Sequence, residues 1–170
     1  MDLLDYSNLV DSEVLIVFLD FHKAFDTIEH QFMYRAFESF GFGERFISII
    51  KMFHKGINSS INLYPNTSKR FPICRGVRQG CPIAPFLFLT VVEFLSIKVL
   101  NSPNIQGLTI FSKQLRLTQL ADDTVLFLKD KDQLPAVLQL VGAFSDASGL
   151  KLNVNKCEIM CLYDSKEKNM

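Results

Sequence analysis

Two strand-like segments of this chain run directly into carboxylates. Val14–Asp20 is a short, apolar, β-branched run that ends in an acid, and two further strand-like runs, Leu115–Leu120 and Thr124–Leu128, are separated only by Ala121-Asp122-Asp123. Runs of this length and composition are typical of strands, and the short gap between the last two is typical of a hairpin. Ionised carboxylates beside a core are costly unless a cation or a partner compensates them. The pattern therefore predicts a sheet with acids gathered at one edge.

The acids concerned are Asp20, Asp122 and Asp123. If the strands that carry them lie side by side, three carboxylates converge and offer the oxygen ligands that magnesium prefers. Two such cations, about 3.5–4 Å apart, can stabilise the attacking and leaving oxygens of a phosphoryl transfer. Asp also favours turns, so the spacing alone leaves an ordinary acidic turn and a strand-ending acid as an equal alternative.

Helical patterns alternate with these strands, which is typical of an α+β domain. Helices are expected over four segments: Asp26–Phe40, Glu44–Lys55, Pro82–Leu100 and Asp132–Ser148. Asp26 or Thr27 is expected to cap the first helix. Glycines that favour a left-handed stop follow three of the helices, at Gly41, Gly56 and Gly149. Two further strand pairs are expected: Ile57–Leu63 with Arg70–Cys74, and Leu150–Val154 with Glu158–Leu162.

The charge of the chain is balanced overall but unevenly distributed. Its 170 residues, 48% of them apolar, fit a single domain. The 18 Lys and Arg residues match the 18 Asp and Glu residues, so the whole chain lacks the positive excess typical of proteins that bind phosphate backbones. Four cations nevertheless lie close together: Lys69, Arg70, Arg75 and Arg78. This local cluster of positive charge is therefore more informative about possible binding partners than the net charge of the chain.

The cysteine spacing argues against a zinc-binding protein, and the apolar runs argue against a secreted or membrane-spanning one. The four cysteines form no CxxC pair and no recognisable ligand set with the histidines, so reduced thiols are favoured over a zinc site. The acidic start of the chain is unlike a signal peptide, and Phe86–Val92 is too short to span a membrane. We therefore expect an intracellular protein of the nucleus or cytoplasm, neither secreted nor bound to a membrane.

Four ordered motifs carry the most specific information in the sequence. Phe18–Asp26 reads FLDFHKAFD, Arg75–Pro82 reads RGVRQGCP and Leu120–Asp123 reads LADD. The fourth, Ser148–Asn153, reads SGLKLN and is followed by Lys156. Together they resemble the palm motifs of reverse transcriptases of non-LTR (LINE-type) retrotransposons, whose patterns are LDxxKAFD, RGVRQGCPLSPxLF, FADD or YADD, and GLxLNxxK.

The resemblance implies an RNA-directed DNA polymerase with an α+β palm, a ferredoxin-like antiparallel sheet backed by helices. It implies two Mg²⁺ ions as cofactors, with Mn²⁺ as an alternative, for transfer of a nucleotide from a dNTP to a primer 3′-hydroxyl. Asp20 and Asp122 match the principal catalytic metal ligands, with Asp123 beside them. The Phe21 carbonyl matches a ligand of the metal on the nucleotide side.

Other motif residues match positions at the incoming nucleotide. Phe25 matches the steric gate, a bulky side chain that rejects a ribose 2′-hydroxyl and so selects deoxynucleotides. Without the resemblance, a plain core Phe remains an alternative for this position. Gln79 and Gly80 match the loop that lies against nucleotide and template, and Lys156 matches a cation near the triphosphate.

Three positions are less clearly assigned. Arg75 and Arg78 are candidates for contacts with nucleic-acid phosphates, and a solvated basic turn is an equally good interpretation of both. Leu120 stands where the family usually has an aromatic ring near the primer end. We expect this change to lower activity without abolishing it.

Residues 14–162 are expected to form the palm domain, between an N-terminal extension on the fingers side, residues 1–13, and a polar tail, residues 163–170. The family's fingers and thumb segments would then belong to a longer polymerase that binds an RNA template, a DNA primer and dNTP. Two alternatives stay open: an inactive palm-fold remnant or binding module derived from a retrotransposon, and an acidic α+β domain that binds metal structurally. Nucleotide binding would separate the polymerase from the last of these.

Overall fold

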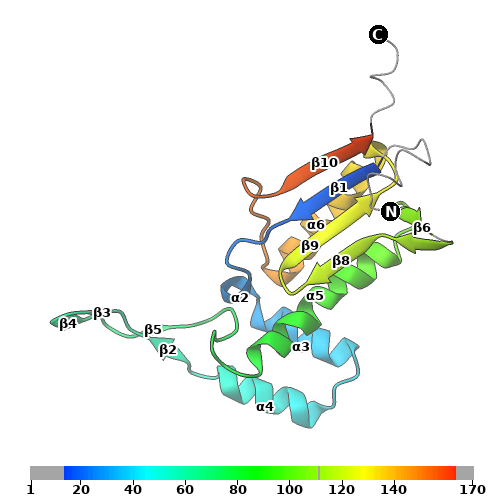
Figure 1. Ribbon diagram of the computed structural model, residues 1–170. Coiled ribbons are helices and arrows are strands. Elements are labelled where there is room, and N and C mark those ends of the chain that lie inside the picture. Colours follow the sequence, from blue (N-terminus) through cyan, green and yellow to red (C-terminus); the bar gives the residue numbers. More distant parts are fainter. Residues whose placement is uncertain (1–13, 111, 164–170) are drawn as a thin grey trace.

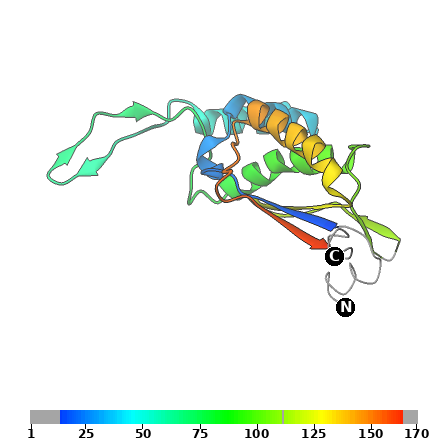
Figure 2. The same ribbon diagram turned by 90° about the horizontal axis from the view of Figure 1, so that it is seen from above.

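The protein combines helices with antiparallel sheets, so the predicted α+β class is confirmed. The computed structural model describes residues 14–110 and 112–163. Figure 1 shows a central sheet, helices packed against it and an arm that projects from the body. Seen from above in Figure 2, the helices form a layer on one side of the sheet. The expected N-terminal extension, and all but the first residue of the expected tail, lie outside the described residues.

Four strands form the central sheet. They are β1 (Val14–Leu19), β8 (Leu117–Leu120), β9 (Asp123–Leu128) and β10 (Glu158–Tyr163). Their order across the sheet is β10-β1-β9-β8, and each neighbouring pair is antiparallel. The first and last strands of the sheet in chain order therefore lie next to each other (Figure 1), which brings residues far apart in sequence to one place.

The pleat of the sheet sorts the side chains of β1 onto two faces. Leu15, Val17 and Leu19 belong to the large core beneath the helices, while Val14 and Ile16 belong to a smaller apolar cluster. Successive side chains of a strand point to opposite faces, and here both faces are covered. This double burial explains why the run is continuously apolar instead of alternating.

Three long helices pack together on one face of the sheet, and a fourth packs on the first of them. In chain order they are α3 (His30–Ser39), α4 (Glu44–His54), α5 (Ala84–Leu100) and α6 (Leu134–Ser148), with a 3₁₀ turn at Lys131–Gln133. Burying an aliphatic or aromatic side chain contributes about 1.5–3 kcal/mol, and Phe88 and Leu95 of α5 are fully buried. No helix within the described residues combines the length and apolar character that crossing a bilayer requires.

A hairpin covers the second face of the sheet. It consists of β6 (Leu108–Ile110) and β7 (Lys113–Leu115), which pair antiparallel. Leu108 packs there with Phe127 of β9 and the outward side chains of β1. The cover is partial, because Leu120 at the far end of β8 is 79% exposed.

The projecting arm is the predicted hairpin between α4 and α5. It contains two short antiparallel ladders, β2 (Asn58–Ser59) with β5 (Phe71–Pro72) and β3 (Asn62–Leu63) with β4 (Asn66–Thr67). A four-residue turn was expected at Tyr64-Pro65-Asn66-Thr67. The observed turn is tighter, because Asn66 and Thr67 pair with β3 as β4. Tyr64 in the remaining turn is 98% exposed.

The predicted start of the first long helix is wrong. Asp26 and Thr27 lie in a separate short helix, α2 (Ala24–Thr27), and α3 follows Glu29 as its N-cap. Glu29 has an extended backbone because it forms an isolated β-bridge with Arg75. A long-range backbone pairing thus interrupts a helix that the local sequence favours. The glycine stops, by contrast, are confirmed by positive φ angles at all three positions.

Two expected strands also differ from the structure. Leu150–Val154 is not a strand; within it, Leu152 forms an isolated bridge with Phe21. The expected strand Leu115–Leu120 is divided at Arg116, because β7 pairs with β6 whereas β8 pairs with β9. Pairing partners, which the sequence does not specify, decide both boundaries.

Candidate functional site

Asp20 and Asp123 lie at the same end of the sheet. β1 and β9 are paired so that Leu19 lies opposite Thr124. Asp20 and Asp123 are the residues directly beyond this last pair. Because Leu19 faces the helices, the pleat directs these two acids to the other face. Cβ atoms of opposed residues in an antiparallel pair are about 4.5–5.5 Å apart, so carboxylates at this end of the two strands can share a ligand.

Asp122 is placed by a tight turn. β8 and β9 are joined through Ala121 and Asp122, with Leu120 paired to Asp123. Ala121 has φ +55°, in the left-handed region that costs a non-glycine residue about 1–2 kcal/mol. Strain of this kind persists only where the surrounding structure enforces it, and it is common at functional sites. The turn therefore holds Asp122 next to Asp123 at the same end of the sheet.

The chemistry of these groups suits a hard cation. Asp20 and Asp122 are half-buried and Asp123 is exposed, and carboxylate oxygens are the ligands that Mg²⁺ prefers. Across residues 14–110 and 112–163, however, no group of three or more His, Cys, Asp or Glu side chains is arranged to hold a metal ion.

The backbone beside Asp20 is oriented by the segment after α6. Hydrogen bonds of 2.8 Å join residues 20–22 to residues 151–153 at both ends of a short antiparallel pairing. Phe21 and Leu152 lie opposite each other between these bonds. A residue flanked in this way directs its own N–H and C=O away from that partner. The Phe21 carbonyl therefore points toward the β9 side, where Asp123 lies.

The fourth motif lies directly against Asp20. The Asn153 N–H donates to the Asp20 carbonyl, and the Asp20 N–H donates to the Cys157 thiol sulfur at 3.4 Å. Lys156 is exposed in the same turn, where its N–H donates to the Asn153 carbonyl at 2.8 Å. Lys156 therefore lies in the turn whose residues Asn153 and Cys157 contact the Asp20 backbone. Cys157 was not identified from the sequence, because its contact spans 137 residues.

The Phe25 side chain packs against α5. Its ring stacks on Phe88, with ring centroids 4.4 Å apart and planes inclined by 12°. The Phe25 carbonyl also accepts a hydrogen bond from the Val77 N–H at 2.7 Å. Phe25 remains half-buried, whereas Phe88 is fully buried. Phe88 belongs to the segment Pro85–Phe88 that continues the second motif, but nothing in the sequence indicated that its ring stacks on Phe25.

The second motif packs tightly on the first. Gly76 has φ +78°, and a Cβ at this position would be 2.7 Å from the Asp26 backbone, so glycine is required. The Gln79 side-chain amide donates to the Asp26 carboxylate at 3.2 Å. Gly80 has φ +82° with open space at its Cβ position. The loop is thus fixed at Gly76 and open at Gly80.

The two arginines of the motif have different surroundings. The Arg75 guanidinium lies 3.0 Å from the Glu29 carboxylate, in an ion pair that is partly exposed. Arg78 is exposed, and within the described residues its side chain forms no ion pair or hydrogen bond. Both arginines line a cleft of about 560 Å³ whose other wall includes Asn58 and Ser59, at the base of the arm. Asn58 and Ser59 lie outside the four motifs, so the sequence did not identify them as candidate site residues.

The register of β1 and β9, the turn with Asp122 and the packing of the motifs bring the four motifs to one end of the sheet. A model of the family described as reverse transcriptase (RNA-dependent DNA polymerase) matches residues 2–170. The chain belongs to this family.

Its relatives are proteins of retrotransposable elements, which confirms the predicted resemblance to non-LTR retrotransposon reverse transcriptases. The chain is 36% identical over 144 residues to a Pol polyprotein from the type-1 retrotransposable element R2 of Popillia japonica. It is 32% identical over 139 residues to a Pol polyprotein from the type-2 retrotransposable element R2DM of Drosophila melanogaster. These matches cover 83% and 82% of this chain but 20% and 13% of those proteins. The chain thus spans a fifth or less of the length of these relatives.

Solved structures of telomerases share the fold. Apo telomerase from Candida tropicalis matches with a TM-score of 0.69 at 11% identity, over 92% of this chain and 30% of that one. Telomerase from Candida albicans in complex with a fragment of telomeric RNA matches with a TM-score of 0.68 at 9% identity, over 92% and 28%. At such identities the likeness concerns the fold alone.

Proposed function

We propose that this chain is the palm segment of an RNA-directed DNA polymerase, with a ferredoxin-like sheet that carries the catalytic carboxylates. The register of β1 and β9 supports the proposal, because Asp20 and Asp123 directly follow its last pair, Leu19 with Thr124, at the end of the sheet where β8 and β9 are joined. The order of elements, strand-helix-strand-strand-helix-strand with β1 between β10 and β9, supports the ferredoxin-like assignment. Folding itself does not require acids to converge, whereas metal binding does.

Two Mg²⁺ ions are the cofactors that this site would bind. Asp20 and Asp122 would be the principal ligands, with Asp123 beside them and the Phe21 carbonyl directed to the same side. When bound, the ions would offset the charge on the attacking and leaving oxygens of nucleotide transfer. Because the described side chains do not close a coordination shell, substrate and water oxygens would complete it. Mn²⁺ accepts the same ligands.

Selection of the nucleotide would depend on the first and second motifs. Phe25 would act as the steric gate. Its stacking on Phe88 supports this role, because the contact restricts movement of the Phe25 ring away from a ribose 2′-hydroxyl. Gln79 would lie against the nucleotide and template. Gly80 leaves space in which a ligand could approach the backbone closely.

The cations around the site would contact phosphates. Lys156, in the turn beside Asp20, would place a positive charge near the triphosphate. Arg75 and Arg78 would contact nucleic-acid phosphates along the cleft at the base of the arm. Their exposure leaves both guanidinium groups accessible to a strand.

The proposed partners are an RNA template, a DNA primer and dNTP, together with the fingers and thumb segments of a longer polymerase. Affinity for a duplex comes mostly from phosphate contacts, and the net charge of this chain is zero. We infer that this segment supplies the chemistry while other segments hold the duplex, in the nucleus or cytoplasm.

Primer extension on an RNA template with Mg²⁺ and dNTPs tests the proposal. The chain is compared with Asp122→Asn and with a longer polypeptide extended at both ends. Activity in the chain that the substitution removes would establish a minimal polymerase. Activity only in the longer polypeptide would identify a palm that needs its neighbours. Absence of activity in both, with the fold intact, would refute the proposal and favour a non-catalytic remnant.

A further inference from the structure

A pocket of about 730 Å³ lies outside the candidate site, between the start of α3, the end of α4 and Cys74. None of the residues matched to metal or nucleotide lines it. Groups that carry or can gain positive charge dominate its lining: His30, Lys51, His54 and Lys55. A pocket of this composition is suited to an anion, and the proposed polymerase function does not use it.

Two stacked histidines form the inner part of the pocket. The rings of His30 and His54 have centroids 4.3 Å apart and planes inclined by 30°. The Nε2 atom of His30 lies 2.8 Å from the Gly76 carbonyl oxygen, and since a carbonyl only accepts, this nitrogen carries a proton and donates it. The Nδ1 atom of His54 lies 3.2 Å from the Tyr34 hydroxyl. Both rings are therefore fixed in place.

The two rings resist becoming charged together in the absence of a ligand. Burial lowers the pKa of His54, and the neighbouring charge of His30 lowers it further, against a smaller opposite effect of the Ile50 backbone. Burial also raises the pKa of the Tyr34 hydroxyl, which stays neutral. An anion bound in the pocket against the stacked rings would favour the charged imidazoles, because it would offset their repulsion.

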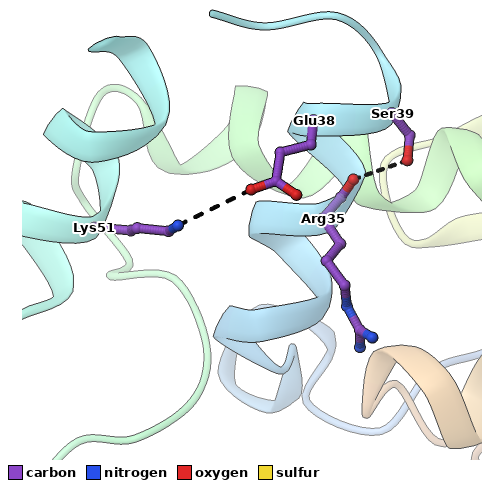
Figure 3. A network of polar contacts seen from close by, with 4 residues as sticks. All are labelled: Arg35, Glu38, Ser39 and Lys51. Atoms are coloured by element: carbon purple, nitrogen blue, oxygen red, sulfur yellow. Dashed lines mark hydrogen bonds and ion pairs between the residues drawn. The ribbon is translucent and has the colours of Figure 1, made fainter. Parts of the chain in front are cut away.

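Two lysines complete the positive lining. Lys51 and Lys55 lie four residues apart at the end of α4, on one side of the helix. Figure 3 shows Lys51 reaching toward Glu38 of α3, and the ion pair is long, at 4.0 Å, and half exposed. Such a pair contributes about 0–1 kcal/mol, so Lys51 can turn to a ligand at little cost. The acid in the lining, Glu29, is compensated by Arg75.

We propose that this pocket binds a phosphate group, held by the stacked imidazoles of His30 and His54 and by the ammonium groups of Lys51 and Lys55. The phosphate belongs either to a nucleic-acid strand or to a nucleotide, and the chemistry recognised is the same. Charge-assisted hydrogen bonds from imidazolium and ammonium groups are shorter and stronger than neutral ones.

Two residues that line the pocket contact the second motif. His30 donates to the Gly76 carbonyl, and Glu29 pairs with Arg75, so two contacts join the pocket lining to the loop that precedes Gln79. A phosphate in the pocket draws on the same His30 ring that supports Gly76. Occupancy of the pocket is therefore coupled to the position of the loop.

The proposal fixes the sign of the pH dependence. The charged and titratable groups around the pair are Glu29, Tyr34 and Glu38 of the α3 region, Lys51 and Lys55 of the α4 region, and Cys74 and Arg75 of the following segment. An anion beside His54 would raise the pKa of this histidine, so binding is fully present below its free-state pKa and is lost as the pH rises through its bound-state pKa. That window begins below the ordinary value of 6.5.

The test follows the imidazole signals of the full chain by NMR during titration with sulfate, whose charge is constant. The His30 and His54 signals are expected to move together, and affinity is expected to fall about tenfold between about pH 5.5 and about pH 8. Short single-stranded RNA and a dNTP serve as further probes. A stronger shift with RNA supports a strand as the source of the phosphate, and a stronger shift with dNTP supports a nucleotide.

Matched variants separate this pocket from general surface charge. Lys51→Gln with Lys55→Gln removes two exposed lysines from the lining and is expected to weaken sulfate binding about tenfold. Lys98→Gln with Lys113→Gln removes two exposed lysines elsewhere and is expected to change it less than about twofold. Equal losses in both double variants, or shifts with sulfate but with neither RNA nor dNTP, would overturn the proposal. Neither readout depends on polymerase activity.

Discussion

The two strand ends that bring the acids together are held by different kinds of contact. The end of β1, with Asp20, is fixed by backbone hydrogen bonds to residues 151 and 153 and by the Cys157 thiol. The backbone that follows it, at residues 26–29, is approached closely by Gly76 and Gly149. The β8–β9 turn, with Asp122, is tied to α5 by a side chain. Gln119 accepts a hydrogen bond from the buried Ser96 hydroxyl at 2.5 Å and donates to the Thr124 hydroxyl at 2.8 Å.

This difference indicates what each half of the site tolerates. Backbone bonds survive most side-chain substitutions but fail when a Cβ is added where no space exists. A side-chain anchor survives backbone changes nearby but fails when that one residue is truncated. Each half therefore has its own points of weakness, and substitutions can test them separately.

The largest expected effect is on catalysis. In the shortest polypeptide that extends a primer, Asp20→Asn and Asp122→Asn should each lower kcat at least about 100-fold, because each removes a negatively charged ligand. Asp123→Asn should cost less, since Asp123 is exposed and serves beside the principal pair. Urea unfolding of each variant controls for stability. Equal and small losses in all three variants would contradict the assigned roles.

Gly149→Ala should destabilise the part of the site that is held by backbone contacts, where Gly149 packs on Thr27. A Cβ there would lie 2.6 Å from the Thr27 carbonyl oxygen, and the residue has φ +81°, so we expect a loss of about 2–4 kcal/mol in the free energy of unfolding. Gly41→Ala is the matched control, because Gly41 has the same φ but open space at its Cβ position. Its cost should be about 1 kcal/mol. If the two variants unfold at the same urea concentration, the close approach at Gly149 is not structurally important.

Gln119→Ala should loosen the side-chain-held half. The buried Ser96 hydroxyl would lose its partner, at an expected cost of about 1–3 kcal/mol in stability. Gln139→Ala, on the exposed surface of α6, should change stability by less than about 0.5 kcal/mol. Thermal or urea unfolding of the pair measures the difference. An indistinguishable result would mean that strand pairing alone positions the turn.

The smallest effect is expected at Leu120, which would sharpen the comparison. This residue is 79% exposed, so Leu120→Tyr should change stability by less than about 0.5 kcal/mol. The ring restores the aromatic residue that the family usually has, and primer extension should rise by about two- to fivefold if it packs near the primer end. A loss of stability beyond that limit would show that the turn is packed more tightly than its exposure indicates.

Local patterns were sufficient to predict much of the fold and the location of the acids. The apolar run of β1, the hairpin of β8 and β9 and the long helices α5 and α6 follow from periodicity and from glycine and proline positions. Convergence of the acids was predicted on the condition that the strands lie side by side, and β1 and β9 do pair. Their detailed roles came from the motifs and remain predictions.

Contacts between distant residues account for what the sequence did not predict. The extended backbone at Glu29 depends on Arg75, and the bridge at Leu152 depends on Phe21. The Gln119 anchor and the stacked histidines likewise join separate elements. Each of these residues has an ordinary local context, so no periodicity or propensity marks it.

The order of strands also has a consequence for synthesis of the chain. β1 lies between β9 and β10, so both of its neighbours in the sheet are made more than a hundred residues later. At about 5–20 residues per second, the 137 residues that separate Asp20 from Cys157 take about 7–27 s to translate. Until β9 is made, the apolar segment VLIVFL has neither of its partner strands, and it lacks β10 for the whole interval; unpaired strands of this kind are prone to aggregate. A nascent chain on the ribosome would therefore depend on chaperones to shield β1 until its two neighbours have been made.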